Sequence, residues 1–232
     1  MPYDHIVVHD TRLRGHVHGR EGIHVIESHC ERLSEIVDRI RAATESRFAS
    51  GPGVVDGVPP PAGAYHTDVS PNPVPTLSIL AHGVDVAQGS SDWAIQLGVE
   101  CIHPGNAQAF GRDISGRITS RIRLLACNAA RSEDGRATCR ALAMGAGVPV
   151  FASDTVQLYS RQERQTTFGG TPITPSQVDG PHGGWINYGA WEGTVYRFDP
   201  AGGNRVEFHG PLPPASTPSE QQERDRYQVV CR

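Results

Sequence analysis

The chain has 232 residues, 38 % of them hydrophobic, which is enough to build one large domain or two small domains around a buried core. Its formal net charge of −4 gives no electrostatic reason to expect nucleic acid or an acidic membrane surface as a partner. All 21 basic residues are arginines, so the absence of lysine excludes Schiff-base chemistry and a lysine general base.

The N-terminal segment MPYDHIVVHDTRLRG carries charges and histidines where a signal peptide needs a continuous apolar stretch. No run of the sequence approaches the ~18 apolar residues that a membrane-spanning helix requires. We therefore expect a protein located in the cytoplasm, or one exported without a cleavable signal peptide, with no membrane as partner.

Two short strands and a helix are predicted at the N-terminal end. β-Branched residues indicate strands at 5–10 and 23–28. Ser28 and Glu31 have the spacing of a capping box, and apolar residues recur behind them at helical intervals. This pattern predicts a helix over about 29–47.

A Pro- and Gly-rich segment over about 49–75 follows, and its composition cannot sustain a helix or a central strand. We interpret it as an insertion within a domain and not as a boundary between domains. The C-terminal segment 211–232 has the composition of an extended or disordered tail. Residues 1–210 are therefore expected to form a single domain.

Strands and helices alternate in the central part of the chain. The run TLSILAH is continuously apolar, as is typical of a strand buried on both faces. The predicted strands lie at 76–82, 121–127 and 148–154, with a hairpin strand at 93–98, helices at 106–118 and 135–147, and a closing hairpin at 183–200. This order indicates an α/β fold with a mainly parallel central sheet.

His82 ends one of the buried strands, and Cys127 ends another. Loops that leave the carboxyl ends of neighbouring parallel strands emerge at the same edge of the sheet. If these two strands are neighbours, the imidazole and the thiol lie close together. The His-Gly dipeptide alone says little, because the chain contains four of them; the joint placement at two strand ends is the informative feature.

A histidine beside a cysteine points to acyl transfer through a thioester. A free cysteine has a pKa of about 8.5, and a nearby imidazole can take its proton and later deliver one to a leaving amine. Gly83 would allow a substrate carbonyl to approach the backbone, and its N–H and that of Cys127 are the candidate oxyanion hole.

The motifs LSILAHG…IQLG and IRLLACNAARSEDGRATCRALAMGAGVPVFASD resemble the caspase-like clan of cysteine peptidases. They are most similar to a bacterial domain family of unknown function that is related to the self-processing protease domains of large toxins. In that pattern one strand ends in Ser-His-Gly, a hairpin carries Leu-Gly, and the next strand ends in Gly-Cys-Asn-x-Ala. The matching residues are His82, Gly83, Leu97, Gly98, Cys127, Asn128, Ala130, Gly135, Leu142, Ala143, Ala152, Ser153 and Asp154. Ala81 and Ala126 depart from it, since the pattern has serine and glycine at these places.

This resemblance implies a caspase-like three-layer sandwich, with a mainly parallel sheet flanked by helices and a C-terminal hairpin. It implies a cysteine endopeptidase that needs no cofactor, with Cys127 as nucleophile and His82 as general base and acid. The substrate would be a polypeptide, either another protein or the chain itself. Asp154 is the candidate for binding an arginine before the scissile bond, against a plain turn or capping role, and Ser153 and Asn128 are candidate neighbours of the substrate.

Other readings stay open at this point. The same fold with an inert cysteine would be a binding or scaffold module. A third reading is a metal-binding protein, because histidines and a cysteine are dense in the N-terminal part, at His16, His18, His24, His29 and Cys30. The five cysteines themselves are scattered and show no C-x-x-C, which argues against a zinc ribbon and a disulfide framework. An anionic effector bound by Arg117, Arg121 and Arg123 is an alternative to a solvated basic face.

Overall fold

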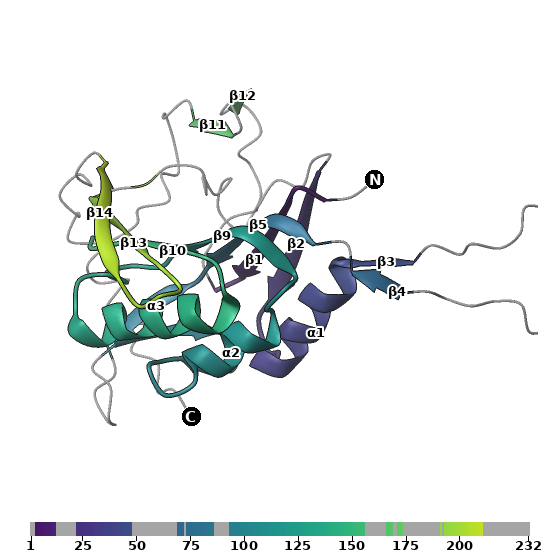
Figure 1. Ribbon diagram of the computed structural model, residues 1–232, viewed down its shortest axis with the longest axis horizontal. Coiled ribbons are helices and arrows are strands. Elements are labelled where there is room, and N and C mark those ends of the chain that lie inside the picture. Colours follow the sequence, from purple (N-terminus) through teal and green to yellow (C-terminus); the bar gives the residue numbers. More distant parts are fainter. Residues whose placement is uncertain are drawn as a thin grey trace, which may run out of the picture.

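The computed structural model describes residues 3–12, 22–47, 69–71, 73–85, 93–155, 166–168, 171–173, 191 and 193–210. In this part the protein has a mixed α/β fold with a mainly parallel central sheet flanked by helices (Figure 1). The seven strands of the sheet are β1 (His5–Asp10), β2 (Ile23–Ser28), β5 (Val74–Leu80), β9 (Ile118–Leu125), β10 (Val150–Ser153), β13 (Thr194–Phe198) and β14 (Asn204–His209). The predicted fold class is confirmed at this level.

The strands of the central sheet follow the order β14-β13-β10-β9-β5-β1-β2. The five strands from β10 to β2 are mutually parallel, and β13 and β14 add an antiparallel hairpin at one edge. The expected closing hairpin therefore exists, over 194–209; the first part of the predicted range, 183–190, lies outside the described residues.

Three short ladders accompany the central sheet. β6 (His82–Asp85), β7 (Trp93–Leu97) and β8 (Glu100–Ile102) form a three-stranded antiparallel sheet. The other two ladders pair β3 (Glu45–Arg47) with β4 (Val69–Pro71), and β11 (Thr166–Phe168) with β12 (Thr171–Ile173). The strand predicted over 76–82 is thus divided, because the chain leaves the central sheet after Leu80 and enters the β6–β7 hairpin.

The first helix, α1 (Leu33–Ala43), is shorter than the sequence predicted. Ser28 and Glu31 do not cap this helix. The Glu31 carboxylate accepts hydrogen bonds from Ser28 Oγ and from the N–H groups of His29 and Cys30, and so fixes the turn before the helix. The chain turns into β3 directly after the helix, and β3 pairs with β4 at the end of the Pro/Gly-rich segment. Residues 48–68 of that segment and the tail 211–232 lie outside the described residues.

The other helices, α2 (Ala107–Asp113) and α3 (Glu133–Ala146), cross at close range through two glycines. A Cβ on Gly111 would lie 2.6 Å from the Leu142 carbonyl oxygen, and one on Gly145 would lie 2.2 Å from that of Gln108. Ser132 caps α3 by accepting a hydrogen bond from the N–H of Gly135, and Gly147, in a left-handed conformation, ends the helix.

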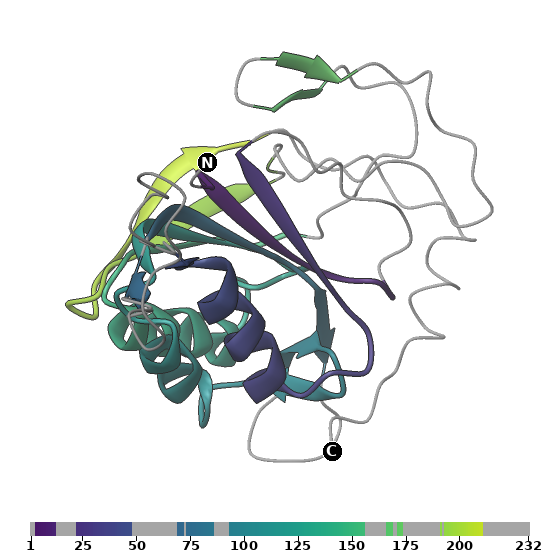
Figure 2. The ribbon, with the colours of Figure 1, turned by 90° about the vertical axis from the view of Figure 1, so that its right-hand side faces the viewer.

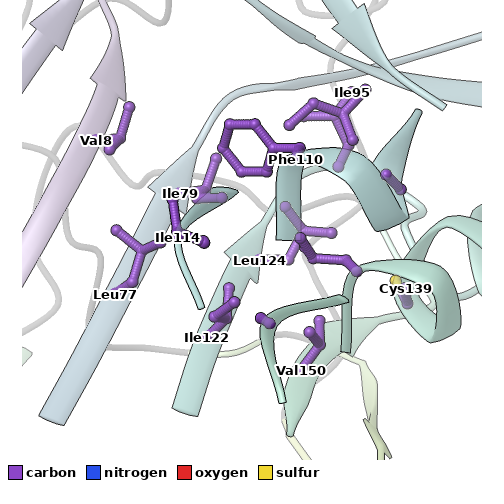
Figure 3. Close-up of a cluster of buried hydrophobic side chains, with 14 of the residues drawn as sticks. Val8, Leu77, Ile79, Ile95, Phe110, Ile114, Ile122, Leu124, Cys139 and Val150 are labelled. Carbon is purple, nitrogen blue, oxygen red and sulfur yellow. The ribbon is translucent and has the colours of Figure 1, made fainter. Parts of the chain in front are cut away.

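All three helices lie on the same side of the central sheet (Figure 2). Side chains alternate along each strand, so one face of the sheet packs against the helices. The resulting core is shown in Figure 3 and includes Val8, Leu77, Ile79, Ile95, Phe110, Ile114, Ile122, Leu124, Cys139 and Val150. The opposite face carries a smaller buried cluster of Val7, Ile23, Leu80 and Leu125. No helix among the described residues covers this second face, so the second helical layer of the expected sandwich is not seen in this part of the chain.

None of the described helices is long and apolar enough to cross a membrane.

Candidate functional site

His82 and Cys127 follow two strands that are direct neighbours in the central sheet. β5 and β9 are parallel, and their last paired residues are Leu80 and Leu125. His82 and Cys127 each come two residues after this pair, so they leave the sheet at the same edge and at the same level. The condition that the sequence analysis left open, that these two strands are neighbours, is therefore met.

The residues just before them lie on opposite faces of the sheet. Ala81 and Ala126 belong to the core under the helices, whereas Leu80 and Leu125 belong to the cluster on the opposite face. His82 and Cys127 come after the last paired residues of β5 and β9. Cys127 carries a free thiol and is partly buried, whereas Cys139 is fully buried.

Gly83 packs directly against the backbone of Cys127. A Cβ added to Gly83 would lie 2.0 Å from the carbonyl oxygen of Cys127 and 3.1 Å from its nitrogen. Only a glycine fits this contact. The carbonyl group of Cys127 therefore occupies the space beside Gly83. The sequence analysis expected a substrate carbonyl to approach there.

The peptide unit that joins Cys127 to Asn128 is hydrogen-bonded at both ends. Its carbonyl accepts a hydrogen bond of 3.1 Å from the indole Nε1 of Trp93, and its N–H donates one of 2.9 Å to the carbonyl of Thr155. Asn128 then takes a left-handed conformation with φ of 57°, which asparagine tolerates better than most residues. The chain can therefore turn sharply directly after Cys127.

The rest of this turn is held by α3 and β10. The N–H of Ala130 donates to the carbonyl of Ser153, and the carbonyl of Ala130 accepts from Arg136 Nε at 2.8 Å. Gly135, in the first turn of α3, lies against the carbonyl of Ala129. Cys127 is consequently placed by a rigid backbone that links two strands and a helix.

His82 is partly buried, and burial lowers the pKa of its imidazole below the ordinary value of 6.5. A hydrogen bond with the backbone of Arg12 and the negative charge of Asp10 act in the opposite direction, while the charge of the Arg12 guanidinium lowers the pKa further. Burial is the largest of these effects, so the folded protein favours the neutral imidazole, the form that can accept a proton.

Asp10 is a site residue that the sequence analysis did not single out. It ends β1, the strand next to β5, and its side chain is fully buried. Its carboxylate accepts hydrogen bonds from the backbone N–H of Arg12 (3.0 Å), from Arg12 Nε (2.8 Å) and from the N–H of Gly98 (3.0 Å), and it forms an ion pair with the Arg12 guanidinium. The available signal was a carboxylate at the end of an apolar strand, two residues before an arginine.

The Asp10–Arg12 pair connects three elements of the site. Arg12 Nη2 donates to the carbonyl of Gly98, which follows β7, so the guanidinium joins the end of β1 to the hairpin that carries His82. Gly98 has φ of +63° and lies against the carbonyl of Glu31, which leaves no room for a side chain. Through these contacts the imidazole is held by the backbone and charges of the β1 end.

The candidate substrate residues have structural contacts of their own. Asp154 Oδ1 accepts a hydrogen bond of 2.9 Å from the N–H of Thr194 at the start of β13. This bond joins the ends of β10 and β13, and it is neither the turn role nor the helix-cap role considered as the alternative to substrate binding. Ser153 is buried, and its hydroxyl lies 3.3 Å from that of Thr155. Asn128 is partly buried beside Cys127. All three lie at the end of β9 or β10, on the same edge as Cys127.

Two of the three basic residues considered for an anionic effector contact other parts of the structure. Arg117 pairs with Glu45 at 3.3 Å, and the guanidinium of Arg123 lies 5.4 Å from the ring centre of Trp191. Arg121 is exposed on β9. Arg117 and Arg123 are thus engaged by different elements.

No group of three or more histidine, cysteine or acidic side chains that could hold a metal ion occurs among the described residues. Of the predicted N-terminal cluster, His24, His29 and Cys30 are described, while His16 and His18 lie outside this part of the chain. Cys101 is disulfide-bonded, and Cys30, Cys127 and Cys139 are free. Burial raises the pKa of the Cys139 thiol above its ordinary value, which makes it an inert core residue.

Comparisons of the chain with protein-family models, with curated proteins and with solved structures found no match. The site is therefore interpreted from its own geometry.

Proposed function

We propose that the protein is a cysteine endopeptidase with a caspase-like fold, in which Cys127 is the nucleophile and His82 the general base and acid. The observation that supports this most is the register of β5 and β9. In this register the two residues follow neighbouring strands at the same level of one edge, His82 with an imidazole pKa lowered by burial and Cys127 with a free thiol. The caspase-like assignment is further supported by the order of strands and by the antiparallel hairpin at the β10 edge.

In the first step His82 takes the proton of the Cys127 thiol, and the sulfur attacks the carbonyl carbon of a peptide bond. A C–S bond forms, and the negative charge that develops on the carbonyl oxygen is stabilised by the candidate oxyanion-hole donors, the N–H groups of Gly83 and Cys127. The imidazolium then returns the proton to the leaving amine as the C–N bond breaks. This leaves a thioester between the acyl group and Cys127.

In the second step water attacks the thioester, and His82 accepts a proton from that water. The C–S bond breaks, a carboxylic acid is released, and the thiol is restored. Because burial lowers the pKa of His82, we expect the acid limb of the kcat/KM profile to lie below pH 6.5. The substrate is a polypeptide, either a separate protein or this chain itself, and no metal or organic cofactor takes part in these steps.

Asp10 and Arg12 have a positioning role in this mechanism. The Asp10 carboxylate binds the N–H of Arg12 and so fixes the main chain that is hydrogen-bonded to His82. A nucleophile, a base and a third group that orients the base are the usual parts of such a site. Here the third group is the backbone of Arg12, supported by a buried carboxylate.

The test is a peptide-library cleavage profile of the wild type, of Cys127→Ala and of the matched control Cys30→Ala. Cys30 is also a free thiol, but it is exposed and follows β2, the outermost strand, which β1 and β5 separate from β9. We expect cleavage by the wild type and by Cys30→Ala, and none by Cys127→Ala. Cleavage that survives in Cys127→Ala would refute the assignment of the nucleophile.

Labelling with iodoacetamide provides a second measure that needs no substrate. An activated Cys127 should react faster than Cys30, although Cys30 is the more exposed thiol. If Cys127 reacts no faster than Cys30 and no peptide is cleaved, the chain is a binding or scaffold module with an inert cysteine. This is the alternative that the sequence also allowed.

A further inference from the structure

The backbone carbonyl of Cys127 has an unusual partner for a group at the end of a central strand. β9 pairs with β5 as far as Leu125, so the carbonyl of Cys127 lies beyond the last backbone pair. Its partner is the indole N–H of Trp93, at 3.1 Å. A carbonyl that is shielded from water needs a hydrogen-bond donor, and the indole N–H supplies one here.

Trp93 can hold this carbonyl firmly because the indole itself cannot move. Its side chain is only 2 % exposed and belongs to the main hydrophobic core under the helices. It lies at the start of β7, and β7 pairs from Trp93 to Gln96 with β6, which begins at His82. One hairpin therefore carries both the candidate base and the group that holds the backbone of the candidate nucleophile.

The hydrogen bond from Trp93 holds the peptide unit that directly follows the candidate nucleophile. The same peptide unit donates its N–H to Thr155, so the two hydrogen bonds together prevent the peptide plane from rotating. Gly83 presses on the carbonyl from the side of β6. The Cα of Cys127 lies in this peptide plane, so a displacement of the plane would move that Cα and, with it, both the sulfur and the N–H that is a candidate oxyanion-hole donor.

We propose that Trp93 is a positioning residue for Cys127, which holds the peptide unit after the nucleophile through its indole N–H. This inference rests on the proposed function and adds to it a residue that the thiol chemistry itself does not require. The indole takes no part in the reaction of the thiol and does not bind the substrate. It acts through the backbone of Cys127.

The test is Trp93→Phe, which keeps an aromatic ring in the core and removes the N–H donor. The matched control is Trp191→Phe, the same chemical change at a partly buried tryptophan whose ring lies under Arg123. Both variants are assayed at a temperature at which circular dichroism shows them folded. A displacement of about 1 Å at a reacting group can cost on the order of 10²-fold in rate.

We expect kcat of Trp93→Phe to fall about 10- to 100-fold while KM changes less than about threefold, and we expect Trp191→Phe to stay within about threefold of the wild type in both. A role confined to stability would lower the melting temperature and leave kcat of the folded protein unchanged. A kcat of Trp93→Phe within threefold of that of Trp191→Phe would overturn the proposal, as would a rise in KM alone.

Iodoacetamide labelling separates this proposal from the proposed function. The rate at Cys127 is divided by the rate at Cys30 in the same sample, so that Cys30 is an internal reference. If the wild type cleaves no peptide, the peptidase proposal fails, and the ratio alone decides about Trp93. A ratio at least threefold lower in Trp93→Phe than in Trp191→Phe supports the positioning role, and equal ratios refute it.

Discussion

Gly83→Ala tests whether the contact between Gly83 and Cys127 assembles the site. The added Cβ would lie 2.0 Å from the carbonyl oxygen and 2.9 Å from the carbonyl carbon of Cys127, while real Cβ contacts below 3.0 Å are essentially never found. These atoms belong to the backbone of Cys127, so no flexible side chain can move away to make room. The two backbones must separate by about 1 Å, the difference between 3.0 Å and 2.0 Å.

Two effects of this separation can be measured. Forcing extra volume into a packed site destabilises a protein by typically about 1–3 kcal/mol. A shift of about 1 Å between the base and the nucleophile lowers the rate on the order of 10²-fold. We therefore expect Gly83→Ala to lose about 1–3 kcal/mol in the free energy of unfolding and on the order of 10²-fold in kcat/KM.

The assay combines urea unfolding with peptide cleavage and with iodoacetamide labelling of Cys127. Gly203→Ala is the matched control, since a Cβ there meets nothing within 4 Å and its φ is not in the left-handed region. A Gly→Ala change at such a position alters stability by less than about 1 kcal/mol, through the unfolded chain. If Gly83→Ala behaves like Gly203→Ala in all three measurements, the contact does not assemble the site and the reasoning is wrong.

Three further predictions concern other parts of the structure. Asp10→Asn leaves the Arg12 guanidinium without its buried counter-ion and should lower the free energy of unfolding, measured with urea, by about 2–4 kcal/mol. Asp113→Asn, at an exposed ion pair, is the control and should lower it by less than about 0.5 kcal/mol. Equal losses in the two variants would contradict the buried network. The pKa of His82 is lowered in the folded protein, so the unfolded chain binds more protons below pH 6.5. Stability should thus be complete above pH 6.5 and fall as the pH drops through the folded pKa, by up to about 1.4 kcal/mol per pH unit. His82→Gln should reduce this slope in urea titrations at several pH values, and an unchanged slope would show that His82 does not cause it. Gly145→Ala places a Cβ 2.2 Å from the Gln108 carbonyl oxygen and should therefore lower the melting temperature. In a helix without this contact, replacing glycine by alanine normally raises the melting temperature. A higher melting temperature for Gly145→Ala would contradict the close crossing of α2 and α3.

The local pattern of the sequence predicted most of the elements. Strands at 5–10 and 23–28 agree with β1 and β2, and the capped helix after Ser132 agrees with α3. These signals depend on residues that are close in the chain: β-branched runs, apolar periodicity and a serine at a helix start. The errors occurred where tertiary contacts decide, as in α1, where Glu31 binds the N–H groups of the preceding turn instead of capping the helix.

The site was predictable in part for the same reason. His82 and Cys127 could be recognised because each directly follows a buried apolar run, which is a local feature. Asp10 and Trp93 could not, because a carboxylate at a strand end and a tryptophan in a hairpin have many ordinary roles. Their roles depend on contacts with Gly98 and Cys127, 88 and 34 residues away in the chain.

The amino-acid sequence by itself therefore determined the strands and helices and the chemical groups that end them, since the period of apolar residues and the capping residues act over a few positions. Which strands become neighbours was decided only by the tertiary structure, because strand order minimises exposed apolar surface over the whole chain. That order placed β9 between β5 and β10, brought Cys127 to the level of His82, and surrounded both with Asp10, Arg12 and Trp93.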